Sequence, residues 1–356
     1  MMRAAVSRYV RLWAVALICL ASTAVSAEAL TVRIGVPDQS AGNKPFIGGP
    51  VGMAFMRHQL EQSLQSQGVT VKWQFFKGAG PAVNEALANQ QLDFAYLGDL
   101  AAIIGRASGL QTRLLLGSRG SDCWLAATQA SGIQQITDLK GKRVAVYRGT
   151  ADQLSFDRTL ASKGLSERDI QVINLDWNAA KAALAAGRVD AVWGGVSLLA
   201  LKSTAINIVA RSSDFGLANT TQAGFVGTDA FIQQHPDITQ SIINVLVQNA
   251  ATISDVQQRE AWAQEMAQHS QLPADLLLQE MQTNYLNFDT SPRRDPFLLS
   301  SFSTSIQQAQ QDRLIRKGFD AATWIDGQFV DNALKTLQLE QHWPQYDASG
   351  KTQSGS

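Results

Sequence analysis

The chain has few of the residues that most often supply disulfides, nucleophiles and metal ligands. Its 356 residues include two cysteines and four histidines. Once the apolar N-terminal stretch that contains Cys19 is removed, Cys123 has no partner for an internal disulfide. The histidines lack metal-ligand spacing, and neither a G-x-S-x-G elbow nor a phosphate loop is present. We therefore expect no cofactor, no metal site and no catalytic centre.

An excess of charge of one sign is also missing. Lys and Arg together number 30, as do Asp and Glu, so the formal net charge is zero. Three arginines are the only charged residues before position 28, and they precede an apolar stretch that is short for a membrane span. This pattern predicts a cleavable signal peptide that ends at Ala27 or, alternatively, at Ala29. Its removal leaves a net charge of about −3, which argues against nucleic acid as a partner.

One pattern occurs twice in the chain without a gap. Residues 86–98 read ALANQQLDFAYLG and residues 183–195 read ALAAGRVDAVWGG. In each copy an alanine-rich helix is followed by a turn, an aspartate and an apolar strand. We interpret Asp93 and Asp190 as residues that stabilise these turns rather than as catalytic groups. Two similar units indicate two lobes with a cleft between them.

The order of elements predicts the fold class. Strands alternate with helices from residue 30 to about 230, which predicts an α/β protein with a mixed sheet in each lobe. One helix is expected from Pro50 to near Gly68, and mainly helices after Asp237. Polar segments 117–122 and 220–225 are the predicted crossings of a two-crossing hinge. The predicted parts are a signal peptide (1–27), a first lobe (28–119 and 222–345), a second lobe (120–221) and a disordered tail (346–356).

Helix N-termini after predicted strands form the core of a candidate binding site. Their unpaired N–H groups and partial positive charge favour anions. Thr150 and Gln153 are placed as a capping-box pair. Arginines and aromatic residues nearby would supply charged hydrogen bonds and an apolar wall, although caps, surface charges and core packing are the alternative explanations. The candidate ligand-binding residues are Gln39, Ser40, Gly80, Pro81, Gly98, Asp99, Arg119, Ser121, Arg148, Gly149, Thr150, Trp177 and Trp193.

Four segments between residues 31 and 250 carry motifs of a known family. Residues 80–87 are similar to G-P-A-x-x-E-A-L, 92–99 to I-D-F-G-x-x-G-D, 138–146 to D-L-K-G-K-x-V-A-V, and 231–237 to F-x-x-x-H-P-D. Together they resemble the periplasmic substrate-binding proteins of ABC importers for aliphatic sulfonates, taurine and nitrate. The resemblance implies a type II periplasmic binding fold, with a ligand between the lobes that is delivered to a membrane permease and its ATPase.

The sequence departs from this family at three strand ends. The usual G-S-N-A-H is replaced by residues 149–153, G-D-A-P-P by residues 98–102, and D-A-W-x-x-W-D-P by residues 190–197. Where the family has Trp-Asp-Pro, this chain has Gly195, Val196 and Ser197. The substitution is expected to open one side of the cleft. It predicts an organosulfur anion that is bulkier than a short sulfonate, such as a sulfate ester.

The sequence thus predicts a periplasmic, monomeric solute-binding protein rather than an enzyme. Its expected partners are a small organic anion, an ABC permease and, through the permease, the ATPase. Three alternatives remain open at this stage. The same scaffold could bind nitrate, taurine or another small nitrogen compound. It could serve a thiamine-pyrimidine synthase, which would need clustered His and Cys, or it could present a ligand to a sensor.

Overall fold

The computed structural model describes residues 30–40, 42, 44–283 and 286–353. The predicted signal peptide and the last three residues of the predicted tail lie outside these residues. Contacts within the chain separate Met1–Leu30 from a compact unit, Thr31–Ser356, and the elements below belong to the second unit. Within the described ranges, no helix combines the length and the apolar character that a membrane span needs.

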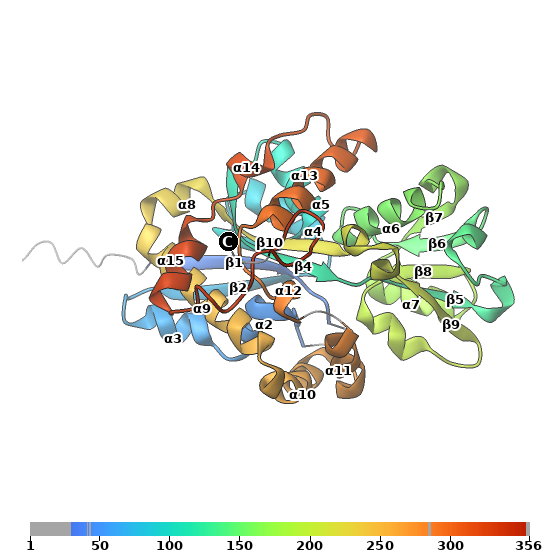
Figure 1. Ribbon diagram of the computed structural model, residues 1–356, viewed down its shortest axis with the longest axis horizontal. Helices are drawn as coiled ribbons and strands as arrows, with labels where there is room; N and C mark the ends of the chain where they lie inside the picture. Colours follow the sequence, from blue (N-terminus) through green and yellow to red (C-terminus); the bar gives the residue numbers. More distant parts are fainter. Residues whose placement is uncertain (1–29, 41, 43, 284–285, 354–356) are drawn as a thin grey trace, which may run out of the picture. The chain divides into compact units, whose positions relative to one another are not determined.

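Sheet A contains five strands in the order β2-β1-β3-β10-β4. Four strands run in the same direction, and β10 runs antiparallel to both of its neighbours, β3 and β4 (Figure 1). In β1, the side chains of Val32, Ile34 and Val36 are buried. The bounds are β1 (Thr31–Pro37), β2 (Thr70–Phe76), β3 (Phe94–Gly98), β4 (Thr112–Ser121) and β10 (Thr221–Thr228).

Sheet B repeats this arrangement with the order β7-β6-β8-β5-β9. Strand β6 is parallel to β7 and β8, while β5 is antiparallel to β8 and β9. Two mixed five-stranded sheets confirm the predicted α/β fold class. The bounds are β5 (Trp124–Thr128), β6 (Arg143–Val146), β7 (Gln171–Asn174), β8 (Ala191–Gly194) and β9 (Ile206–Arg211).

The repeated aspartates connect neighbouring strands in both sheets. The Asp93 carboxylate accepts hydrogen bonds from the backbone N–H and the guanidinium of Arg33 in β1, over 2.6–2.9 Å. Asp190 accepts the same three bonds from Arg143 in β6, over 2.8–3.2 Å, and these bonds lower the pKa of Asp190. Each carboxylate thus binds the adjacent strand, and the same two arginines also donate to carbonyls of the turns, at Gln90, Gly187 and Arg188. A turn-stabilising role for these aspartates stays a prediction.

Helices cover both faces of sheet A (Figure 1). One face carries α4 (Ala79–Ala88), α5 (Asp99–Ala107) and α13 (Pro296–Gln311). The other carries α2 (Gly49–Met56), α3 (Gln59–Gln65) and α9 (Pro236–Ser254). The single helix predicted after Pro50 is wrong, because His58 takes a left-handed φ of 52° that separates α2 from α3. Sheet B is flanked by α6 (Ala151–Ala161) and α7 (Trp177–Ala185).

The predicted crossing segments are largely strand. Strand β4 continues to Ser121 and pairs with β10, so that Gly117 lies opposite Gly224. A Cβ on Gly117 would lie 2.5 Å from the Leu298 side chain, so packing, rather than a turn, requires glycine at this position. The chain passes from sheet A to sheet B between β4 and β5, and it returns before β10. The division into two lobes at these points stays a prediction.

The chain after β10 is helical. Its first part forms α8 (Asp229–Gln234), α10 (Arg259–Ser270), α11 (Ala274–Thr283) and α12 (Leu286–Asp289), and its last part forms α14 (Ala321–Trp324) and α15 (Gln328–Thr336). Residues 346–353 were predicted to belong to a disordered tail, but they make defined contacts in the structure. Tyr346 is 5% exposed and forms a β-bridge with Thr352, and Asp347 accepts a hydrogen bond from the backbone N–H of Lys351.

Candidate functional site

A cavity of about 330 Å³ is lined by residues from both sheets and from the helices that follow β10. It lies at the end of β4, the beginnings of α2 and α7, the short helix Val196–Leu201, and the helices α10 and α11. The lining residues that matter most here are Gln39, Phe46, Gly48, Gly49, Val51, Tyr96, Arg119, Ser121, Asp122, Cys123, Asp152, Trp177, Asn178, Lys181, Gly195, Val196, Ser197, Trp262, Met266, Leu277, Glu280, Met281 and Asp289.

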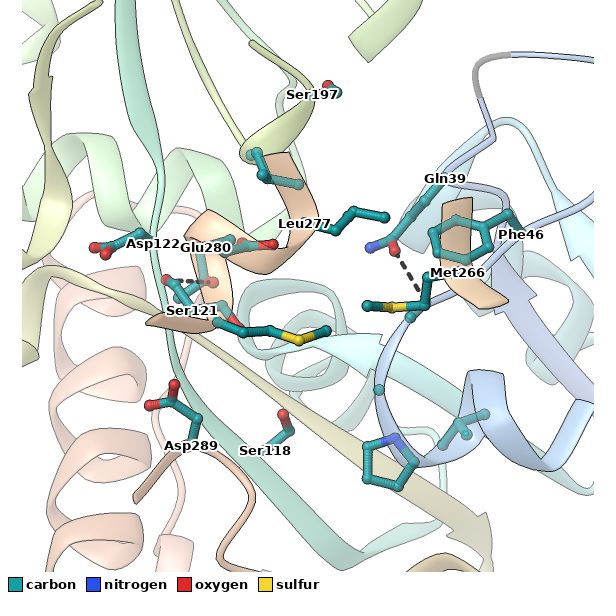
Figure 2. Close-up of a pocket in the computed structure, with 18 of the residues that line it drawn as sticks. Gln39, Phe46, Ser118, Ser121, Asp122, Ser197, Met266, Leu277, Glu280 and Asp289 are labelled. Carbon is teal, nitrogen blue, oxygen red and sulfur yellow. Dashed lines mark hydrogen bonds between the residues drawn. The ribbon is translucent and has the colours of Figure 1, made fainter. Parts of the chain in front are cut away.

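One part of the cavity wall is apolar. Phe46, Trp262, Met266 and Met281 belong to one buried apolar cluster, which also contains Leu277. Figure 2 shows Met266 beside Phe46, with Leu277 nearby. Methionine adapts its shape to irregular partners, so this wall suits the organic part of a small solute.

Hydrogen-bond donors lie at a second part of the wall, which we call the donor side: Gln39, Asn178, Lys181 and the first residues of α2. No side chain caps α2, which begins at Gly49 with a proline in its first turn. Its N-terminal N–H groups carry partial positive charge. Burial lowers the pKa of the Lys181 ammonium, and Asp176 opposes this shift. The donor side therefore favours an anionic or hydrogen-bond-accepting group.

Carboxylates lie at a third part, which we call the acid side: Asp122, Glu280 and Asp289. Asp122 is 3% exposed and accepts hydrogen bonds from the hydroxyl and the backbone N–H of Ser213 and from the hydroxyl of Ser212. Burial, together with Asp122, raises the pKa of Glu280 to about 7. Burial also raises the pKa of Asp289 well above its usual value, with contributions from Asp122 and Glu280. These three groups are close enough to repel one another when ionised.

Arg119 lies next to the acid side, but its positive charge is balanced by a carboxylate outside this group. Its Nη1 donates to both carboxylate oxygens of Asp295, at 2.7 and 2.8 Å, and its Nη2 donates to the carbonyl of Arg293. The side chains of this ion pair are 0% and 1% exposed. The guanidinium also lies over the rings of Phe288 and Phe297. Asp295 therefore neutralises Arg119 within the protein.

Cys123 and Asp152 form a hydrogen-bonded pair on the cavity wall. The thiol donates to one oxygen of Asp152 at 3.5 Å, and the indole N–H of Trp177 donates to the other at 2.8 Å. Burial, then the Asp152 charge, raises the pKa of the Cys123 thiol well above its usual value. The thiol therefore stays protonated, a form with poor nucleophilicity. In the described part of the chain, no group of three or more His, Cys, Asp or Glu side chains is placed to hold a metal ion.

The structure brings four of the sequence-predicted site residues to the cavity: Gln39, Arg119, Ser121 and Trp177. Tyr96 and the residues of the family departure, Gly195 to Ser197, line it as well. The other nine do not line it: Ser40, Gly80, Pro81, Gly98, Asp99, Arg148, Gly149, Thr150 and Trp193. For the whole set, ligand contact stays a prediction.

The three predicted helix N-termini meet one another. A Cβ on Gly80 would lie 2.3 Å from the Cβ of Ala101 in α5, and a Cβ on Gly98 would lie 2.8 Å from the Cβ of Ala151 in α6. Gly149 has φ +76°, and a Cβ there would lie 3.0 Å from Pro81. Glycine at these places allows α4, α5 and α6 to approach closely, and the neighbouring helices occupy the space that it leaves.

The predicted capping box at α6 is also different. Thr150 does not cap the helix, because its hydroxyl donates to the carbonyl of Tyr147 at 2.7 Å. The Gln153 amide oxygen accepts from the backbone N–H of Gly149 at 2.9 Å. Nearby, Arg148 forms an ion pair with Glu167.

The remaining predicted residues contact other parts of the protein. Asp99 is 0% exposed; it accepts from the Ser305 hydroxyl at 2.8 Å, and Arg158 lies 3.7 Å away. Burial raises the pKa of Asp99, although Arg158 opposes this effect. Trp193 is 1% exposed within the core of sheet B, and the Ser40 carbonyl accepts from the amide of Asn178 at 3.2 Å.

Sequence reasoning missed the contribution of the C-terminal third. Four lining residues come from α10, α11 or α12, which follow the last of the family motifs: Trp262, Met266, Glu280 and Asp289. No motif or repeat marks these positions, because their placement depends on how helices far along the chain pack beside β4.

Comparison with known proteins places the chain among solute-binding proteins. A Bacillus subtilis protein named for binding aliphatic sulfonates is 29% identical over 318 residues, which are 85% of this chain and 88% of that protein. The crystal structure of a periplasmic sulfonate-binding protein of an ABC transporter from Methylobacillus flagellatus has a TM-score of 0.78 and 27% identity, covering 90% of this chain and 99% of that one.

A more distant likeness is restricted to the fold. The structure of a desulfurization enzyme has a TM-score of 0.62 at 15% identity, covering 86% of this chain and 99% of the enzyme. The two proteins described above have higher identity, and both are named as sulfonate-binding proteins. The NMT1/THI5-like family matches residues 60–258, more than half of the sequence, and the chain belongs to this family.

Proposed function

We infer that the protein is the solute-binding component of an ABC importer and that it takes an organosulfur anion, a sulfonate or a sulfate ester. The observation that carries the proposal is the cavity of about 330 Å³, with apolar walls and a few polar groups. Cavities of this size and character are typical of small-molecule sites. The names of the two sulfonate-binding relatives suggest the chemical class.

In this proposal the anionic group lies at the donor side. The Lys181 ammonium and the uncapped N-terminus of α2 would stabilise it, because N–H donors and a positive charge lower the energy of a desolvated anion. The organic part would pack against Trp262 and Met266. Gly195 would leave room for a bulky group, since a Cβ at this position would meet no atom within 4 Å.

Binding without catalysis fits the chemistry of the cavity. Among the nucleophilic side chains that line it, the Cys123 thiol is kept protonated by burial together with Asp152. A periplasmic location and delivery to a permease and its ATPase rest on the names of the relatives and on the predicted signal peptide. In proteoliposomes that contain the permease and ATPase, the loaded protein should raise the rate of ATP hydrolysis.

A thermal-shift screen of residues 28–356 tests the ligand class. The panel contains alkyl and aryl sulfonates, sulfate esters, taurine, nitrate and sulfate. A ligand at 100 times its Kd stabilises the folded state by about 2.7 kcal/mol, which corresponds to a rise in Tm of about 4 °C for a unit of this size. We expect such a shift with at least one organosulfur anion. A shift with nitrate and none with any organosulfur compound would contradict the proposal.

A further inference from the structure

The acid side places a half-buried carboxylate, Asp289, in the cavity wall beside two others, Asp122 and Glu280. The side chain of Asp289 forms no ion pair or hydrogen bond with any residue of the described ranges. The serine hydroxyls and the N–H that bind Asp122 carry no net charge. The charge of Asp289 therefore lacks a local counter-charge, and its two acidic neighbours oppose its ionisation.

Two cationic side chains of the described residues line the cavity, and neither compensates Asp289 at close range. Arg119 donates to both oxygens of Asp295, in a pair that solvent does not reach, and it acts on Asp289 only at longer range. Lys181 lies on α7, and the acidic residue that influences it is Asp176, at the start of that helix. Neither cation forms an ion pair with Asp289.

An ionised carboxylate that is partly shielded from water and has no partner is unfavourable, and the protein can relieve it in two ways. The carboxylate can take up a proton, or a cation can lie beside it. A charge-assisted hydrogen bond from an N–H⁺ donor to a carboxylate is about twice as strong as a neutral one. A cavity that has a carboxylate wall and an apolar wall thus discriminates in favour of organic cations and against plain anions.

We propose that the solute carries a protonated nitrogen, which binds at the acid side, while its anionic group occupies the donor side. Figure 2 shows Asp122 and Glu280 on one side and Gln39 with Phe46 on the other, with Leu277 between them. A solute with separated positive and negative groups and an apolar body complements the three parts of the cavity. The anionic half of this statement rests on the proposed function, and the cationic half rests on the acid side alone.

Three matched compounds separate the two halves. The first is 3-(cyclohexylamino)propane-1-sulfonate, which carries both charges at neutral pH. The second is 4-cyclohexylbutane-1-sulfonate, in which a methylene replaces the nitrogen. The third is N-propylcyclohexylamine, which lacks the sulfonate. Isothermal titration calorimetry at pH 7 gives the Kd of each, and we expect the first compound to bind at least tenfold more tightly than the second, about 1.4 kcal/mol.

Two variants test whether the acid side causes this preference. Asp289→Asn and Glu280→Gln keep the shape of the side chain but remove its negative charge, so each should reduce the ratio of the two sulfonate Kd values severalfold. Asp331→Asn is the control, because Asp331 is exposed on α15 and does not line the cavity. The control should leave the ratio unchanged.

Each outcome decides one half of the inference. Equal binding of the two sulfonates, or a preference that both acid-side variants retain, would overturn the protonated nitrogen. Binding of the amine without sulfonate, as tight as that of the first compound, would overturn the organosulfur proposal and leave the cationic group in place. If none of the three compounds binds, the inference is overturned as well.

Discussion

Replacing Arg119 with methionine should destabilise the protein strongly, because it leaves Asp295 buried without its cation. The two side chains are 0% and 1% exposed, and removal of one partner from such a pair costs about 3–5 kcal/mol. Unfolding entropy is about 2.1 cal/mol/K per residue. For the unit Thr31–Ser356 this gives about 0.7 kcal/mol/K, so we expect a fall in Tm of about 4–7 °C.

The double variant Arg119→Met with Asp295→Asn provides the control. The asparagine side chain would keep the hydrogen bond that Asp295 accepts from the backbone N–H of Leu298 at the start of α13, but it carries no charge. The methionine side chain would remain in contact with the rings of Phe288 and Phe297, over which the guanidinium lies. Differential scanning calorimetry should therefore show that the double variant regains more than half of the lost Tm. A single variant with a fall below about 2 °C, or a double variant as unstable as the single one, would refute this reasoning.

Two further predictions concern the cavity and the response to pH. Gly195→Trp should weaken the binding of 3-(cyclohexylamino)propane-1-sulfonate more than tenfold, about 1.4 kcal/mol, by filling open space on the cavity wall. The control is Ala200→Trp, at an exposed position of the short helix Val196–Leu201 that follows Gly195. Equal Kd values for the two variants would contradict the expectation. Burial and the charge of Glu167 raise the pKa of Asp157 to about 8, so the folded state binds the extra proton and stability falls as the pH rises from about 4 to 8. In urea titrations Asp157→Asn should match the parent at about pH 3.5 and exceed it by at least about 1 kcal/mol at about pH 8.5; a constant difference between the two pH values would argue against this assignment.

The fold could be predicted from the sequence to a large extent because its signals are local. Alternating apolar residues, glycine at element ends and the repeated pattern at 86–98 and 183–195 indicated two α/β units, and the two sheets have the same arrangement of strands. The family motifs were recognised for the same reason, since each is a short continuous segment. The ion pairs Arg33–Asp93 and Arg143–Asp190 join residues 60 and 47 positions apart, and no local pattern marks such partners.

The candidate site was predictable only in part. Gln39, Arg119, Ser121 and Trp177 line the cavity, and the departure at 195–197 does so as well. The helix N-termini after the predicted strands have the local signature of anion sites, yet they pack against neighbouring helices. A short sequence shows that glycine begins a helix, but it does not show whether a ligand or another helix occupies the space beside it.

By itself the sequence determined the order of strands and helices, the two mixed sheets and the membership of the NMT1/THI5-like family, because these follow from local patterns and motifs. Only the tertiary structure decided the charge and the walls of the cavity. Asp122 follows β4, whereas Glu280 and Asp289 belong to α11 and α12, far later in the chain. Burial at one place raises the pKa of the latter two. Arg119 is neutralised because the chain brings Asp295 to it from 176 positions away. Burial and long-range pairing are properties of the packed chain, and they set the electrostatics that a solute meets.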